Sequence, residues 1–173
     1  LGLWIGLTAR IIMTAMQFAG YQIGLVSGLA NAFAPSMGSF QGATLIASAL
    51  MMAATALIFV TDLHHVIIGA LLMSYQVFPV GRIMPGDLAE QTVRAAGMSL
   101  YLGVSLAAPF YAMGLVLNVG LGLANRMMPT LPVFFVAAPV LIASGLFVLV
   151  MAAPFMLRGF LERFADWLGL LSF

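Results

Sequence analysis

The sequence is poor in charge, with 6% of its 173 residues being Asp, Glu, Lys or Arg and with no lysine at all. Soluble domains carry about 25% charged residues, so this chain cannot build an ordinary water-facing surface. Apolar residues make up 64% of it, which predicts a protein that is integral to a membrane or buried in a membrane-protein assembly. The net charge is +1 and the arginines are scattered. Nucleic-acid binding needs clustered cations to neutralise phosphates, so we exclude that function.

Residues for catalysis and metal binding are also scarce. Without cysteine the chain has no disulfide, thiolate nucleophile or thiolate metal site. No GxSxG, HExxH, phosphate-binding loop or pair of carboxylates occurs in it. The two histidines, His64 and His65, follow Asp62. Neighbouring positions on a helix point about 100° apart, and no Cys or Glu stands nearby to complete a zinc site. We therefore expect no catalysis, no metal and no cofactor.

Long apolar segments predict an all-α fold that forms one domain over residues 1–173. The expected helices span residues 1–29, 43–60, 63–78, 88–117 and 133–155. The second and third of these read as a helical hairpin with a polar tip, in which Asp62 caps the later helix. Asp87 and Glu90 have the spacing of a capping box at the start of the fourth, and Pro109 predicts a kink within it.

The first apolar segment carries a small-residue stripe and one arginine. Gly20, Gly24 and Gly28 recur every fourth residue, a pattern that lets another helix approach closely, although ordinary membrane-helix composition would also explain it. Arg10 lies inside the segment. An ionisable residue at membrane depth usually faces protein or water, so we expect this helix to pack among subunits.

Two breaks stand out between the apolar segments. In residues 31–42, Pro and Gly stop the helix, and the apolar side chains either fold back on a neighbouring core or project into a passage. The candidate passage-blocking residues are Asn31, Phe33, Met37 and Phe40. The second break, within residues 118–145, contains Arg126 and Pro129 between hydrophobic segments. It predicts a stiff, polar corner.

Residues 157–173 form an amphipathic segment at the end of the sequence. The charged residues Arg158, Glu162, Arg163 and Asp166 alternate with the apolar residues Phe160, Phe164, Trp167 and Leu171 at helical spacing. Such a segment lies at a membrane interface or docks on a partner.

Several motifs together resemble the FliR family of flagellar export-gate proteins, whose virulence-system relatives are the SctT proteins. The segments ARIIMTAMQFAGYQIGLVSGLA (residues 9–30), TDLHHVII (61–68) and FPVG (78–81) match family patterns. The longest match is LNVGLGLANRMMPTLPVFFVAAPVLIASG (117–145). Its signature residues are Asn118, Gly122, Arg126, Pro129, Phe134, Pro139 and Gly145.

The resemblance implies a helical subunit of a type III export gate in the bacterial inner membrane, at the flagellar basal body. It implies FliP-, FliQ- and FlhB-like partners, a channel for unfolded flagellar proteins, and a plug loop at residues 31–42. It also implies that the first several dozen residues of the family are missing. Two alternatives stay open: an export-gate subunit of a virulence system, and a membrane transporter or channel that acts alone.

Overall fold

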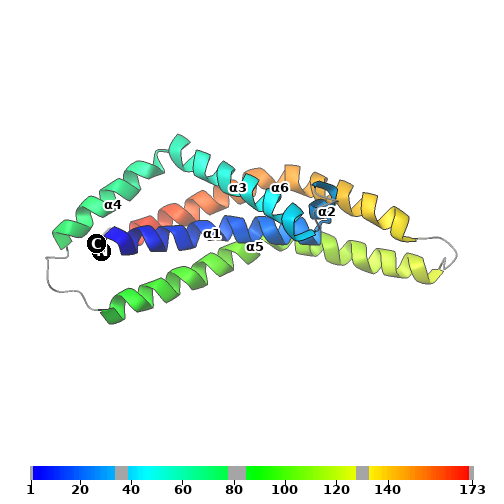
Figure 1. The fold of residues 1–173 in the computed structure, drawn as a ribbon, viewed down its shortest axis with the longest axis horizontal. Coiled ribbons are helices and arrows are strands. Elements are labelled where there is room, and N and C mark those ends of the chain that lie inside the picture. The colour runs from blue at the N-terminus through cyan, green and yellow to red at the C-terminus, as the bar shows by residue number, and fades with distance from the viewer. Residues whose placement is uncertain (1, 34–38, 78–84, 128–132, 172–173) are drawn as a thin grey trace.

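The computed structural model describes residues 2–33, 39–77, 85–127 and 133–171, and every regular element in these ranges is an α-helix. The all-α prediction is therefore confirmed. The helices are α1 (Gly2–Val26), α2 (Leu29–Phe33), α3 (Ser39–Val60), α4 (Leu63–Val77), α5 (Pro85–Met127) and α6 (Val133–Leu171). They form an elongated bundle in which α1 runs along the middle, with α3 and α5 on opposite sides of it (Figure 1).

Helix α1 is the central helix because one of its faces is small and apolar along its whole length. Its buried residues recur at spacings of three and four: Ile5, Thr8, Ile12, Ala15, Met16, Ala19, Gly20, Ile23 and Gly24. This spacing brings them onto one side of a helix with 3.6 residues per turn. Helix α1 packs mainly against α3 and α5: Gly20 and Gly24 lie against α3, and Ala15 lies against α5.

The predicted glycine stripe is confirmed at two of its three positions. A Cβ atom on Gly20 would lie 2.6 Å from the Cα of Ala47, and one on Gly24 would lie 2.9 Å from the Cα of Ala43. Ordinary carbon contacts are about 3.5–4.0 Å, so α1 and α3 touch backbone to backbone. Gly28 differs, because it lies beyond the end of α1 and has a φ of +69°.

Polar side chains set the register between α1 and α5. The indole Nε1 of Trp4 donates to Thr92 Oγ1 at 2.9 Å, and the hydroxyl of the buried Ser99 donates to the Ile11 carbonyl oxygen at 2.7 Å. Because apolar contacts alone are not directional, these two bonds specify which turns of the helices face each other.

The last two helices are much longer than predicted. Helix α5 continues ten residues past the expected end at 117, and α6 runs on through the amphipathic segment 157–171 without interruption. Prolines inside these helices did not end them: Pro109 in α5, and Pro139 and Pro154 in α6. Helix α5 bends about halfway along its length, in the region of Pro109, as predicted (Figure 1).

Two smaller predictions were wrong. Asp87 is the third residue of α5, not its cap, and Glu90 pairs instead with Arg94 at 2.6 Å. Helices α3 and α4 make few contacts and meet at a wide angle (Figure 1), so they are not a packed hairpin. Helices α5 and α6 contact each other more extensively than α3 and α4 do, and they run in opposite directions.

The amphipathic end of α6 packs inward on the chain's own core. Phe160, Phe164 and Leu168 are fully buried, and the rings of Phe160 and Phe164 stack with centroids 5.8 Å apart. The four charged residues of this segment, Arg158, Glu162, Arg163 and Asp166, are all exposed. The predicted amphipathicity is confirmed, and the partner of its apolar side is this same chain.

Candidate functional site

A sharp break separates α1 from α2 and aims the short helix at α3 and α6. The Ser27 hydroxyl donates to the Ile23 carbonyl oxygen at 2.5 Å and accepts from the Leu29 N–H at 3.4 Å. Gly28 follows with its left-handed φ of +69°, a conformation that glycine adopts without steric cost. The predicted first helix, residues 1–29, therefore ends earlier, at Val26.

The α1–α2 break is also where α6 reaches the first helices. A Cβ on Gly145 would lie 2.6 Å from the Ser27 Cβ, so α6 presses its backbone against the break. Gly145 is one of the signature residues, and this contact explains why a side chain would not fit there.

The break expected at residues 31–42 is shorter at both ends than predicted. Asn31 and Phe33 belong to α2 and Phe40 belongs to α3, whereas Met37 lies outside the described residues. Helices α2 and α3 touch so closely that a Cβ on Gly42 would overlap the Ala30 carbonyl oxygen and lie 2.6 Å from its carbon. The chain thus leaves α2 and enters α3 from two helix ends that are fixed against each other.

The signature residues do not converge on one spot. Asn118, Gly122 and Arg126 are exposed on the last turns of α5, and Arg126 lies in the final turn, where a cation interacts favourably with the helix dipole. Pro129 lies outside the described residues. Phe134, Pro139 and Gly145 belong to α6. The stretch 118–145 therefore comprises the end of α5, residues 128–132, which lie outside the described residues, and the beginning of α6.

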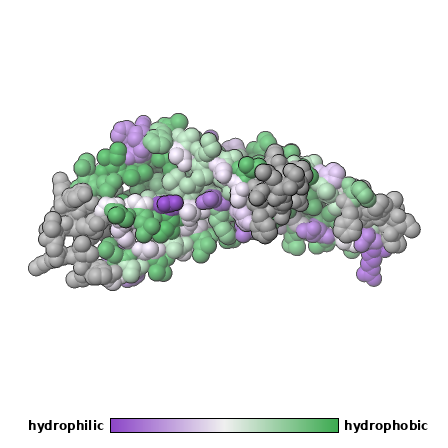
Figure 2. Space-filling model, viewed as in Figure 1, coloured by the Kyte–Doolittle hydropathy of each residue, from purple (hydrophilic) through white to green (hydrophobic). Residues whose placement is uncertain are grey.

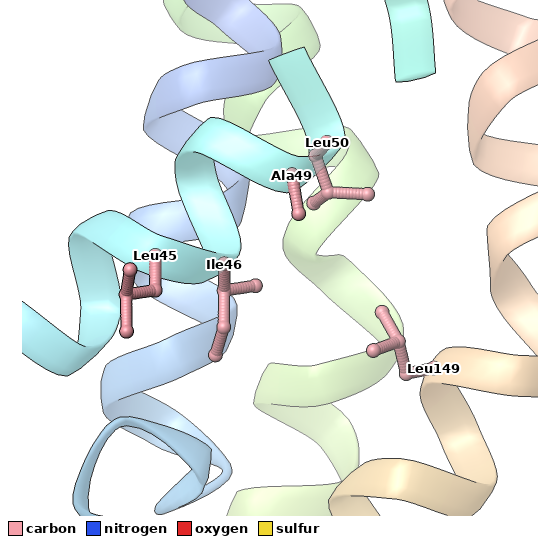
Figure 3. Close-up of a pocket in the computed structure, with 5 residues that line it drawn as sticks. All are labelled: Leu45, Ile46, Ala49, Leu50 and Leu149. Atoms are coloured by element: carbon pink, nitrogen blue, oxygen red, sulfur yellow. The ribbon is translucent and has the colours of Figure 1, made fainter. Parts of the chain in front are cut away.

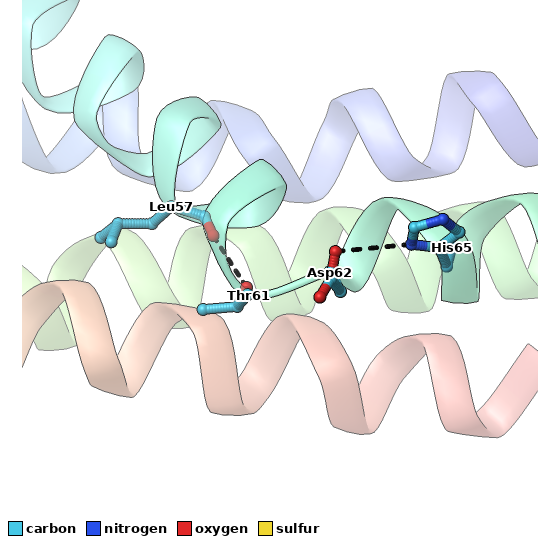
Figure 4. Close-up of polar contacts among 4 residues, drawn as sticks. All are labelled: Leu57, Thr61, Asp62 and His65. Carbon is cyan, nitrogen blue, oxygen red and sulfur yellow. Dashed lines mark hydrogen bonds and ion pairs between the residues drawn. The ribbon is translucent and has the colours of Figure 1, made fainter.

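A polar turn joins α3 to α4 (Figure 4). Thr61 continues α3, since its N–H and its hydroxyl both bond the Leu57 carbonyl oxygen at 2.8 Å. Asp62 has a φ of 58°, and one carboxylate oxygen lies 3.6 Å from His65 Nδ1. The Asp62 carbonyl oxygen accepts from the His65 N–H at 3.0 Å and so begins α4. The predicted start of this helix at residue 63 is confirmed.

An open apolar groove of about 420 Å³ lies between α3 and α6 (Figure 3). Leu45, Ile46, Ala49 and Leu50 of α3 form one wall, and Leu149 of α6 lies opposite. A second hollow of about 440 Å³ has more polar walls, formed mainly by α1 and α5. Its residues are Thr14, Gln17, Phe18, Tyr21, Thr44, Ser99 and Leu100. Neither hollow contains an acid, a base or a histidine among these residues.

The comparison with known protein families is decisive. The family described as "Bacterial export proteins, family 1" matches residues 1–167. The flagellar biosynthetic protein FliR of Caulobacter vibrioides is 34% identical over 173 residues, which cover 99% of this chain and 69% of that protein. The chain belongs to the FliR family of bacterial export proteins.

The matches to other FliR proteins cover a smaller share of those proteins. The Escherichia coli FliR is 30% identical over 155 residues, and the Pectobacterium carotovorum FliR is 31% identical over 159. In each case the match covers 89% of this chain and 59% of the relative. Family membership, together with four helices of membrane-spanning length among the residues that the structure describes, makes this FliR family member a membrane component of the type III export apparatus, which serves protein export and flagellum biogenesis.

This FliR family member exposes more surface than a compact soluble protein of its mass. Its accessible area is 10603 Å², whereas about 8,100 Å² is expected for a globular monomer of 18.3 kDa. Apolar residues cover most of the face seen in Figure 2, with polar residues in small separate groups. Surface of this kind is covered by lipid or by protein partners.

Proposed function

We propose that the chain is a subunit of the flagellar type III export gate in the bacterial inner membrane, at the flagellar basal body. With FliP- and FliQ-like subunits, and beside an FlhB-like subunit, it forms the channel through which unfolded flagellar proteins are exported. The flagellar names of its relatives support this function over a virulence system. Its role is structural rather than catalytic, and the driving energy is supplied by other parts of the apparatus.

The observation that carries this proposal is the length of α5 and α6 combined with their apolar surfaces. At 1.5 Å per residue, the 43 residues of α5 and the 39 residues of α6 extend about 64 Å and about 58 Å. The hydrocarbon core of a bilayer is only about 30 Å thick. About half of each helix must then lie beyond the lipid, and its apolar side chains need protein neighbours there.

Each of the two helices carries an exposed apolar stripe that fits a neighbouring helix. On α6 the stripe consists of Phe147, Val150, Met151 and Phe155, which are between 60% and 75% exposed. On α5 it consists of Leu115, Val119, Leu123 and Met127, which are between 55% and 82% exposed. Residues spaced by three and four share one face of a helix, so each set presents one continuous ridge for packing.

The role of the segment between α2 and α3 as a plug follows from the same proposal. The tight contact of Ala30 with Gly42 supports it, because the segment between them is then held at both ends. Phe33, Met37 and Phe40, with Asn31 at the start, close the lumen when no chain is passing, since Phe and Met fill irregular space well.

The assembly is tested by purifying the full-length protein from its own membranes in a mild detergent. We expect FliP- and FliQ-like subunits to co-purify with it. If the isolated protein conducted ions in liposomes without any partner, that result would instead support a transporter that acts alone. Co-purification with virulence-system homologues would assign the protein to a virulence system. Either result would refute the flagellar gate.

The plug is tested separately by a Phe33→Ala, Met37→Ala double variant in cells that keep all other gate subunits. We expect the membrane to become leaky to small ions, because two bulky side chains no longer fill the lumen. A Met52→Ala, Leu72→Ala double variant, at exposed positions on α3 and α4 outside both stripes, is the matched control and should not leak. Equal leak in the two variants would rule out the plug role while leaving the gate intact.

A further inference from the structure

The polar turn between α3 and α4 brings together three side chains that can bind a metal ion. Asp62, His64 and His65 each offer one ligand atom, and these atoms all lie within 4.8 Å of one another. The three residues fall within a stretch of four, so the local backbone keeps their side chains close together. The Asp62 backbone is held by its N–H bond to the Phe59 carbonyl oxygen at 3.3 Å and by the bond it accepts from His65.

The two histidine rings do not diverge as neighbouring helical residues would be expected to. Their centroids are 4.1 Å apart and their planes are inclined by 40°. His65 Nδ1 lies 3.6 Å from an Asp62 carboxylate oxygen. Two ligand atoms on a tetrahedral zinc ion, each about 2.1 Å from the metal, are about 3.4 Å apart. The Asp62–His65 pair is already close to this separation, and side-chain rotation brings His64 nearer.

A second, independent observation concerns His64 Nδ1. This atom is buried and has no hydrogen-bond partner among the described residues. Buried polar atoms are almost always paired, and an unpaired one calls for a specific explanation such as an ion or a water molecule. In metal-bound histidine one ring nitrogen ligates the ion and the other forms a hydrogen bond elsewhere. His64 has a ring nitrogen with no hydrogen bond to the part of the chain that the structure describes, so its imidazole can serve as a metal ligand.

We propose that Asp62, His64 and His65 bind one divalent transition-metal ion, with Zn²⁺ as the best-fitting occupant. Two imidazoles and one carboxylate are ligands that zinc takes, and water or a neighbouring group completes the coordination. The bound ion joins Asp62, in the turn after α3, to His64 and His65 in the first turn of α4, and so stiffens the connection between two helices that make few other contacts. This site is independent of the proposed export function.

Binding is measured on the full-length protein in mild detergent, carrying an affinity tag without histidine and stripped of metal with a chelator. Calorimetric titration with Zn²⁺ should show one ion that is lost in the His65→Gln and Asp62→Asn variants. We expect the affinity to fall at least about tenfold in each, because each removes one ligand of three. The Asp87→Asn variant makes the same chemical change at an exposed position on α5 and should bind like the wild type.

A second measurement is thermal stability, since an ion that binds the folded chain raises its melting temperature. Zn²⁺ should raise the melting temperature of the wild type and of Asp87→Asn but not that of Asp62→Asn. Asp62 and His65 are exposed, so their variants should fold even if a His64 variant does not. Absence of a saturable Zn²⁺ site in the wild type, or equal affinity in all the variants, would overturn the proposal.

Discussion

The contact between α2 and α3 is tight enough that a single methyl group at Gly42 should disturb it. In Gly42→Ala the new Cβ would lie 2.6 Å from the Ala30 carbonyl carbon and 2.8 Å from its Cα. Since ordinary carbon contacts are about 3.5–4.0 Å, the two backbones must separate by about 1 Å. Leu29 and Ala30 are buried, with exposed fractions of 0% and 1%, so α2 cannot yield without opening the core around it.

The size of the effect follows from two opposing terms. Overpacking a well-packed contact costs about 1–3 kcal/mol, and a clash with backbone belongs at the upper end. Replacing Gly by Ala within a helix returns at most about 1 kcal/mol. The net destabilisation is then about 2 kcal/mol, which for a chain of this length lowers the melting temperature by about 4–8 °C.

The measurement is the melting temperature of the detergent-solubilised chain, followed as the monodisperse fraction that survives heating. Gly97→Ala on α5 is the matched control, because a Cβ there meets nothing within 4 Å, and it should melt at the wild-type temperature or slightly above. If Gly42→Ala melted no lower than Gly97→Ala, the close approach of α2 and α3 would be refuted.

Three further predictions concern the hydrogen bond between α1 and α5, the core and the outer stripe of α6. Trp4→Phe removes the 2.9 Å hydrogen bond to Thr92 and should destabilise the chain by about 0.5–1.5 kcal/mol. If the Trp4→Phe, Thr92→Val double variant were destabilised by the sum of the two single variants, the bond would contribute nothing. Phe164→Ala empties a fully buried site and should lower the free energy of unfolding by about 3–5 kcal/mol. Phe147 is 68% exposed on α6, so Phe147→Ala should leave the melting temperature of the isolated chain unchanged and should reduce the amount of partner subunits that co-purify. A fully retained complex with Phe147→Ala would contradict the packing role of the stripe.

The sequence predicted best where apolar and polar residues change abruptly. The start of α4 after Asp62 was predicted correctly, because an uninterrupted apolar run gives way to Thr61 and Asp62 at that point. The close approach at Gly20 and Gly24 was also predictable from spacing alone.

The predicted ends of the last two helices, at residues 117 and 155, were too early, although the expected helices already contained Pro109, Pro139 and Pro154. In an apolar chain Gly and Pro are tolerated inside helices, since neighbouring helices can satisfy the backbone. Helix α5 therefore passes through Gly120 and Gly122, and α6 passes through Pro154. The break at residues 31–42 was set too wide because Gly42 was treated as a helix stop, whereas α3 begins before it. The cluster at Asp62, His64 and His65 was missed because the angle between backbone positions does not fix where the side chains point, and the two histidine rings turn toward each other, with centroids 4.1 Å apart.

The prolines within α5 and α6 change the backbone hydrogen bonding on the outside of the bundle. All three, Pro109, Pro139 and Pro154, are exposed. A proline has no N–H, so the carbonyl oxygen four residues earlier loses its helical donor. The oxygens concerned belong to Ser105, Phe135 and Val150, which lie on otherwise apolar helices. An acceptor left bare in hydrocarbon costs several kcal/mol. Each of these oxygens lacks the donor that an unbroken helix would supply, so water, a side chain, a neighbouring helix or a local change in helix geometry has to provide it.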